Sequence, residues 1–209
     1  MAIRMKSEDR RAAILRTAIH LFAEKGFRGT TTRGLAAAAG VTEPVLYQHF
    51  PSKKDLYAAI IEAKAGSALG HAAELRALAA SGEDARFVIT LAGLILRRYN
   101  EDPELSRLLL FSSLENHELS DLFFERVYEG FHKLVTGYIR RRVREGAFRK
   151  VNAEIAARSL LGMISYHGHM ALLFPGRFSL TGLEKLAAES AAIFLGGVRA
   201  GDDCAPRVV

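Results

Sequence analysis

The sequence predicts an all-α protein, and three observations support that prediction. Apolar residues recur at spacings of three and four nearly throughout the 209 residues, which is the period of a helix face. Strand-like alternation between turn signals is almost absent. Helix-starting and helix-ending residues recur along the chain and predict about nine helices, arranged as a three-helix N-terminal bundle that contains a helix-turn-helix and a larger C-terminal helical bundle.

Three of the predicted helices lie within the first fifty residues. Ser7, followed by two acidic residues, starts a helix that we expect to end at Gly26. A short helix over about 32–39 is broken by Gly40, and Thr42 caps a third helix over about 43–49. Small residues at a crossing point, with a glycine free to adopt a positive φ in the turn, are typical of a helix-turn-helix.

The remaining helices are predicted from their end signals. A capping box at Ser52 to Asp55 starts a longer fourth helix. The Ser81–Asp84 segment is predicted to cap a helix over about 84–100, and Asp102 with Pro103 to open one over about 103–114. Further helices are predicted at about 118–145, at about 153–174, and from a Thr181–Glu184 box to about 198.

Charge and cysteine content narrow the class of protein. The chain carries 29 Lys and Arg against 23 Asp and Glu, and residues 1–58 hold ten of the basic and five of the acidic side chains. The spare positive charge therefore lies in the first quarter, where it favours a polyanionic partner. A single cysteine, Cys204, predicts no internal disulfide. With neither a signal peptide nor an apolar membrane span in view, we expect a cytoplasmic protein that does not enter a membrane.

Polar residues on the outward-facing side of the helix-turn-helix are suited to contact with DNA. Arg33 can bond guanine O6 and N7 with two parallel hydrogen bonds, and the neighbouring threonine hydroxyls can donate to phosphates. Lys53 and Lys54 are expected to face the DNA backbone from the start of the fourth helix. The predicted DNA-binding residues are Thr31, Thr32, Arg33, Thr42, Glu43, Pro44, Val45, Tyr47, Gln48, His49, Lys53 and Lys54.

Residues 10–60 resemble the TetR family of bacterial transcriptional regulators. The resemblance rests on fixed spacings in Gly26-Phe27-Arg28-Gly29-Thr30-Thr31-Thr32, Leu35-Ala36, Ala39-Gly40-Val41, Leu46-Tyr47-Gln48-His49-Phe50 and Ser52-Lys53-Lys54-Asp55-Leu56. Pro44 departs from the pattern, which usually has glycine or a small residue there. The resemblance implies a homodimer, a DNA-binding domain over residues 1–58 and a helical ligand-binding and dimerisation domain over residues 59–198. We expect residues 199–209 to form a disordered tail.

Two further sets of residues are predicted in the C-terminal part. An interior rich in Phe, Leu and Met favours a largely apolar small-molecule effector, oriented by Tyr or His. The expected ligand-binding residues are Phe87, Leu91, Leu94, Phe111, Phe123, Val127, Phe131, Met163, Tyr166, His167 and Met170. The last two helices carry more apolar residues than one core readily covers, so we expect a four-helix dimer interface. Its predicted members are Ala156, Leu160, Ile164, Leu183, Leu186, Ala187, Ser190, Ala191 and Phe194.

Other groupings favour structural roles. His167 and His169 point about 200° apart on a helix, so they do not predict a chelating pair. The basic run Arg140–Arg142 closes a helix, where cations complement the helix dipole. Ser112, Ser113, Glu115 and His117 have the residue types of a hydrolytic triad but no strand-turn-helix elbow, so we expect a helix end and a loop. We predict no catalytic residue, no metal site and no cofactor.

Together these features predict a ligand-responsive, sequence-specific DNA-binding regulator rather than an enzyme. Its expected partners are a palindromic double-stranded DNA operator, a small-molecule effector and a second copy of the chain, with repression favoured over activation. An all-helical ligand carrier or enzyme with a basic interaction bundle is the competing interpretation. A nonspecific nucleoid or adaptor protein is a third, and competition with unrelated DNA distinguishes it.

Overall fold

The computed structural model describes residues 7–115 and 118–200, except for the side chains of residues 64–72, 118, 119, 126 and 127. Within these ranges it contains helices and two isolated β-bridges but no strand, as the sequence predicts. The helices group into two compact units, Met1–Leu69 with Asp102–Tyr128 and Gly70–Glu101 with Glu129–Val209. These units are defined by packing. The boundary at residue 58 between a DNA-binding domain and a ligand-binding domain stays a prediction.

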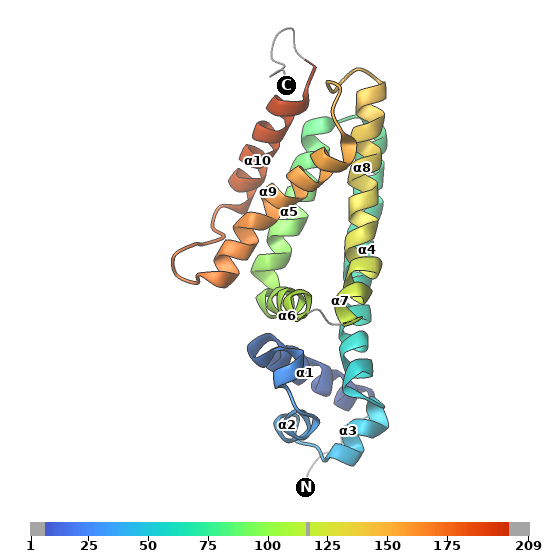
Figure 1. The fold of residues 1–209 in the computed structure, drawn as a ribbon, viewed down its shortest axis with the longest axis vertical. Helices are drawn as coiled ribbons and strands as arrows, with labels where there is room; N and C mark the ends of the chain where they lie inside the picture. Colours follow the sequence, from blue (N-terminus) through green and yellow to red (C-terminus); the bar gives the residue numbers. More distant parts are fainter. Residues whose placement is uncertain (1–6, 116–117, 201–209) are drawn as a thin grey trace. The chain divides into compact units, whose positions relative to one another are not determined.

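The first unit is built on α1 (Ser7–Gly29), α2 (Thr32–Ala38) and α3 (Glu43–His49) (Figure 1). The first part of α4 (Lys53–Ser81), α6 (Pro103–Leu114), α7 (Glu118–Phe123) and a π-helical segment (Phe124–Tyr128) complete it. Helix α1 contacts both α2 and α6. The buried core of this unit includes Ile14, Ala18, Phe22, Leu35, Leu46, Leu56, Tyr57, Ile60, Leu105 and Leu108.

The second unit contains the last part of α4 with α5 (Asp84–Glu101), α8 (Glu129–Arg144), α9 (Ala153–Leu173) and α10 (Leu183–Val198). Helix α5 packs against both α9 and α10 (Figure 1). Its buried residues Phe87, Val88, Leu91, Ala92 and Leu96 recur at spacings of one, three and four, so α5 buries a broad face.

Some predicted helix boundaries are confirmed and others need correction. The unbroken part of α1 ends at Gly26, as the sequence predicts, because φ is 70° and ψ is 173° there, and one further helical turn follows to Gly29. The hydroxyl of Thr30 donates to the carbonyl of Gly26 at 2.8 Å and so holds this extra turn on the helix. The predicted helix over 118–145 is divided by the π-helical segment between α7 and α8. Arg199 and Ala200 do not fray, because their N–H groups bond Leu195 O and Ala147 O. Most of the predicted tail, residues 201–209, lies outside the described residues.

Predicted caps succeed where the side chain reaches the first turn. The Ser52 hydroxyl accepts from Asp55 N and donates to its carboxylate, and Asp102 accepts from Leu105 N at 3.1 Å, so both predictions are confirmed. The Thr181–Glu184 box is wrong, because Gly182 caps α10 in a left-handed conformation with φ of 63°. Thr42 precedes α3 but makes no side-chain cap bond.

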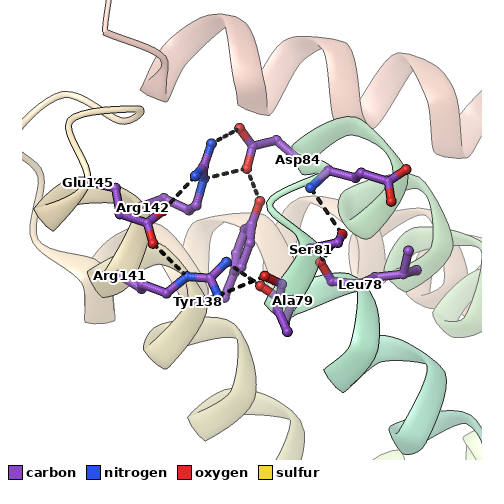
Figure 2. Close-up of polar contacts among 10 residues, drawn as sticks. Leu78, Ala79, Ser81, Asp84, Tyr138, Arg141, Arg142 and Glu145 are labelled. Carbon is purple, nitrogen blue, oxygen red and sulfur yellow. Dashed lines mark hydrogen bonds and ion pairs between the residues drawn. The ribbon is translucent and has the colours of Figure 1, made fainter.

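The predicted Ser81 box is also wrong. The Ser81 hydroxyl donates to Leu78 O and accepts from Glu83 N, which leaves Asp84 for a different role. Figure 2 shows that the Asp84 carboxylate faces Arg142 and Tyr138 of α8. Arg142 Nε lies 2.8 Å from Asp84 Oδ1 and Arg142 Nη2 lies 3.0 Å from Asp84 Oδ2, and the Tyr138 hydroxyl donates to the same carboxylate.

Arg141, the residue before Arg142, binds the end of α4. Arg141 donates to the carbonyl oxygens of Ala79 and Ala80, the last-turn carbonyls that have no partner within their own helix (Figure 2). Glu145 pairs with both Arg141 and Arg142. Burial and the Asp84 bond raise the pKa of Tyr138, and Asp84 raises the pKa of Arg142. The basic run therefore closes α8, as the sequence indicates, and it also holds the α4–α5 turn, which the sequence does not predict.

Removing the Asp84 carboxylate should destabilise the second unit. The side chains of Asp84 and Arg142 are only 12% and 17% exposed, so the change Asp84→Ala leaves a poorly solvated cation. We expect a loss of about 2–4 kcal/mol in the free energy of unfolding, measured by urea denaturation. The control Glu83→Ala, which breaks an exposed pair with Arg86, should cost no more than about 0.5 kcal/mol. Equal losses in the two variants would contradict this account.

Candidate nucleic-acid interface

Helices α2 and α3 form the helix-turn-helix that the sequence predicts. The turn passes through Gly40, which has a φ of 65°, and Val41 N donates to Ala36 O at 2.9 Å. Leu35, Ala36 and Leu46 are 1–2% exposed and hold the two helices on the core of the first unit. The small side chain of Ala36 lets the helices approach closely at their crossing.

The predicted DNA-binding residues lie on the outer side of these helices and at the start of α4. We call these twelve residues, from Thr31 to Lys54 as given above, the α2–α3 surface. Its exposed members are Thr31, Arg33, Thr42, Pro44, Tyr47, Gln48 and Lys54. Its partly buried members are Thr32, Glu43, Val45, His49 and Lys53. None of them is buried in the core, so all twelve side chains are at least partly accessible.

The two threonines at the start of α2 have different partners. Thr31 is the N-cap of α2, and its hydroxyl oxygen accepts from Gly34 N at 3.0 Å. An accepting hydroxyl still carries a hydrogen that it can donate. The Thr32 hydroxyl instead donates to Glu43 Oε2 at 3.1 Å, which joins the start of α2 to the start of α3.

Lys53 makes internal bonds. Its ammonium donates to Phe27 O at 2.8 Å and to Thr30 O at 2.9 Å, and it lies 4.2 Å from the centre of the Phe27 ring. Burial lowers the pKa of Lys53, and the nearby Glu115 carboxylate acts in the opposite direction. Its contact with DNA stays a prediction, whereas its bonds to the last turn of α1 are a feature of the fold.

Glu115, which the sequence places at a helix end, holds the same turn from the other direction. It caps α6, and its Oε2 accepts from Phe27 N at 3.1 Å and from Arg28 N at 3.4 Å. A Cβ on Gly26 would collide with this carboxylate, so glycine is required there for space as well as for its positive φ. The glycines of the Gly26–Thr30 segment are the one sequence signal of this close approach.

Helix α6 also contacts α4 and α1 at two other points. The Ser112 hydroxyl donates to Leu108 O and is bonded to the Tyr57 hydroxyl of α4, so it takes part in packing. Burial raises the pKa of Tyr57 to about 12. At the start of α6, Glu104 Oε1 lies 2.8 Å from His20 Nδ1 of α1 and raises the pKa of His20. The other member of the suggested triad, His117, lies outside the described residues.

The predicted effector-binding residues are divided between the two units. Phe87 and Leu91 are completely buried, and Leu94, Phe131 and Met163 pack against the same core. His167 and Met170 are half-buried on α9, and Tyr166 is 55% exposed. Phe111 and Phe123 are partly buried members of the first unit, and the side chain of Val127 lies outside the described residues. Their contact with a ligand stays a prediction.

The second unit also contains a polar pair that the sequence does not predict. The Tyr99 hydroxyl of α5 lies 2.9 Å from His169 Nε2 of α9, and Gly168 leaves the room that the Tyr99 ring occupies. Burial raises the pKa of Tyr99 and lowers that of His169. His169 thus contacts α5, and the sequence signal for this contact is the glycine beside the histidine.

One open depression of about 340 Å³ lies where α8 meets α9. It is lined by Arg140, Val143, Arg144, Val151, Asn152, Ala153 and Glu154. Arg140 Nη2 lies 3.3 Å from Glu154 Oε1, so the arginine and the carboxylate neutralise each other at its edge. No predicted effector residue lines this depression.

The predicted dimer residues face the core of their own chain. Ala156, Leu160, Ile164, Ala187, Ser190, Ala191 and Phe194 are at most 9% exposed, and Leu183 and Leu186 are partly buried against them. The opposite sides of α9 and α10 expose large apolar residues, among them Ile155, Tyr166, Leu173 and Ile193. The face that meets a partner copy stays a prediction.

The described residues contain neither a cluster of candidate metal ligands nor a membrane-spanning helix. That part of the chain contains no group of three or more His, Cys, Asp or Glu side chains placed to hold a metal ion. None of the helices there is long and apolar enough to cross a membrane.

The helix-turn-helix, its exposed polar residues and the helical second unit define a DNA-binding regulator. Residues 14–60 match the model of the bacterial regulatory proteins of the tetR family, and residues 90–197 match the C-terminal domain of AefR-like transcriptional repressors. The chain belongs to the TetR family, as the sequence motifs indicate, and is a ligand-responsive DNA-binding transcriptional regulator. Regulators of this family bind DNA operators and small-molecule effectors and act as dimers.

Similar proteins span most of the chain. The HTH-type transcriptional repressor KstR2 of Rhodococcus jostii is 33% identical over 156 residues, which cover 72% of this chain and 74% of that protein. The nucleoid occlusion factor SlmA of Vibrio vulnificus is 29% identical over 165 residues, which cover 76% and 82%. The structure of the fatty acid degradation regulator FadR from Bacillus halodurans has the same fold, with a TM-score of 0.70 at 21% identity over 90% of this chain and 99% of that chain.

Exchanging Lys53 for methionine should test its bonds within the fold. Lys53→Met keeps an unbranched side chain but removes the ammonium beside the Phe27 ring and leaves the carbonyls of Phe27 and Thr30 without this donor. We expect the free energy of unfolding to fall by about 1–2 kcal/mol, measured by chemical denaturation. Lys54→Met removes the same charge from an exposed side chain and should change it by less than about 0.5 kcal/mol. A Lys53 variant of undiminished stability with weakened DNA binding would instead make Lys53 a phosphate contact.

Proposed function

We propose that this protein is a homodimeric repressor that binds a pseudo-palindromic operator through paired α3 helices and leaves it when a largely apolar effector binds. The observation that carries the proposal is the α2–α3 surface, because it exposes hydroxyl, amide and guanidinium groups on a rigid helix-turn-helix in the basic part of the chain. Two such surfaces about 34–36 Å apart would match half-sites separated by one turn of DNA.

Arg33 is proposed as the main reader of guanine. It is exposed on the first turn of α2, and a guanidinium can bond guanine O6 and N7 together. Tyr47, Gln48 and His49 lie on the last turn of α3, where their polar groups suit phosphates or base edges. Val45 is suited to a thymine methyl group. Thr31 and Lys54 are proposed as phosphate contacts.

Helix α4 is proposed as the lever of the response. It is one continuous helix whose first residue bonds the end of α1 and whose last-turn carbonyls bond Arg141. The mechanism requires an effector that binds more tightly to a conformation in which the two α3 helices are further apart. Such an effector lowers operator affinity by the ratio of its affinities for that conformation and for the operator-bound one. Equal operator affinity with and without a ligand shown to bind the protein would exclude this mechanism.

The effector is proposed to be largely apolar with one polar group. Apolar side chains dominate the interior of the second unit, and the Tyr99–His169 pair is a partly buried hydrogen-bonding group in the same unit. Such a pair can orient a ligand by its hydroxyl or carbonyl oxygen.

The dimer is proposed to form through the outer faces of α9 and α10. Ile155, Ser159, Gly162, Tyr166 and Leu173 share one face of α9, because they recur at spacings of three, four and seven. Ile193 of α10 is 66% exposed, and Gly162, Gly196 and Gly197 have open space where a side chain would stand. Small residues beside large apolar ones let two helix pairs approach closely and fill the gap between them.

Selection of bound sequences from a random duplex pool tests the proposed function. We expect an inverted repeat with half-sites near one helical turn apart, bound in the presence of excess unrelated DNA. Arg33→Ala should weaken specific binding by about 1–3 kcal/mol and relax one position in each half-site. The control Arg86→Ala removes the same charge from the second unit and should leave that position unchanged. Failure to enrich any sequence would instead favour the carrier or enzyme interpretation.

The oligomeric state tests the proposed interface. Ile193→Glu places a charge at an exposed large apolar position of α10 and should convert the dimer to a monomer, measured by analytical ultracentrifugation. Ile89→Glu makes the same change at a 39% exposed position of α5 and should leave the dimer intact. A dimer that persists in the Ile193 variant places the interface elsewhere.

A further inference from the structure

Glu43 is the one carboxylate among the twelve residues of the α2–α3 surface. It is partly buried in the first turn of α3, and its Oε2 accepts the hydrogen of the Thr32 hydroxyl at 3.1 Å. The first residues of the second helix of a helix-turn-helix are those that meet base edges. A negative side chain therefore stands at the most base-proximal part of a surface that is otherwise suited to a polyanion.

A carboxylate at this place has few partners on DNA. Phosphate oxygens repel it, and most groups in the major groove are acceptors like itself. The donors available there are the amino groups of cytosine and adenine. On adenine the amino group adjoins the acceptor N7, whereas the cytosine ring offers its N4 amino group without an adjacent acceptor. Cytosine is therefore the better partner for Glu43.

Thr32 makes this side chain a fixed acceptor. A threonine hydroxyl has one hydrogen, and Thr32 uses it on Glu43 Oε2, so it does not donate to a phosphate at the same time. The other carboxylate oxygen remains for an amino group. Two helices fix the arrangement, because Thr32 starts α2 and Glu43 starts α3 across the turn at Gly40.

We propose that Thr32 and Glu43 act together as a base-reading unit, in which Glu43 accepts a hydrogen bond from a cytosine N4 amino group. Thr32 is then a positioning residue that acts through Glu43 and not the phosphate contact that the sequence suggests. The proposal rests on the proposed function, since it requires that α3 enters the major groove of an operator. It identifies one position of each half-site as cytosine.

Three variants test the proposal by selection from the random duplex pool and by affinity on the selected operator. Glu43→Gln should lower the preference for cytosine at one position of each half-site by roughly ten-fold and favour adenine there, because an amide bonds adenine N6 and N7. Thr32→Val should weaken the same preference. Thr32→Ser, which keeps the hydroxyl, should restore it. Binding to unrelated DNA, and its salt dependence, should not change between Thr32→Val and Thr32→Ser.

The matched control is Thr31→Val, in which a neighbouring hydroxyl is lost by the same substitution. It should weaken binding to all duplexes alike and leave every base preference in place, since phosphate contacts carry no sequence information. Thermal unfolding of each variant separates a folding defect from a change in base preference.

The possible outcomes separate the base-reading unit from the proposed function. If the unaltered protein enriches no sequence, the proposed function fails before any variant is tested. If it enriches an inverted repeat whose base preferences survive both Glu43→Gln and Thr32→Val, the base-reading unit is refuted and the Thr32–Glu43 bond only joins α2 to α3. The base-reading unit is also refuted if Thr32→Val lowers affinity equally for every sequence, because Thr32 is then a phosphate contact.

Discussion

The turn from Gly26 to Thr30 is the constraint on which the first unit depends. It ends α1 and leads directly into α2, and two opposite charges hold its backbone. Lys53 of α4 binds its carbonyl oxygens, and Glu115 of α6 binds its N–H groups. Charged groups bonded to backbone at partly buried sites are among the stronger contacts that a small helical bundle can make. The helix-turn-helix therefore takes its position from α4 and α6, two other helices of the same unit.

Several charged side chains of the types that often bind ligands instead satisfy helix ends. Arg141 binds the last carbonyls of α4, Glu115 binds amides beside Gly26, and Lys53 binds the carbonyls at the end of α1. Helix ends leave backbone groups without partners, and long charged side chains from neighbouring helices reach them. In an all-helical protein with many ends, a local excess of charge is consequently a weak guide to binding. The α2–α3 surface differs because most of its polar residues are exposed.

Within that surface the structure separates residues of the same chemical type. Thr31 and Thr32 are adjacent, yet one hydroxyl caps α2 and the other bonds a carboxylate on α3. Lys53 and Lys54 are also adjacent, and Lys53 bonds the turn that precedes α2 while Lys54 is exposed. Successive residues of a helix point about 100° apart, so neighbours in sequence meet different surroundings. The proposed division of labour between phosphate contact, base contact and positioning rests on that geometry.

The sequence alone determined the helical class, the helix-turn-helix, the set of polar residues on its outer side and the caps at Ser52 and Asp102. These features depend on residues within one or two turns of one another, where period and spacing decide the result. Tertiary structure alone decided which face of α9 and α10 is core, because both helices carry apolar residues on more than one side. It also decided the partners of Lys53, Glu115 and Asp84, which lie between 23 and 88 residues away. No local pattern encodes such pairs, since they form only when distant helices pack together.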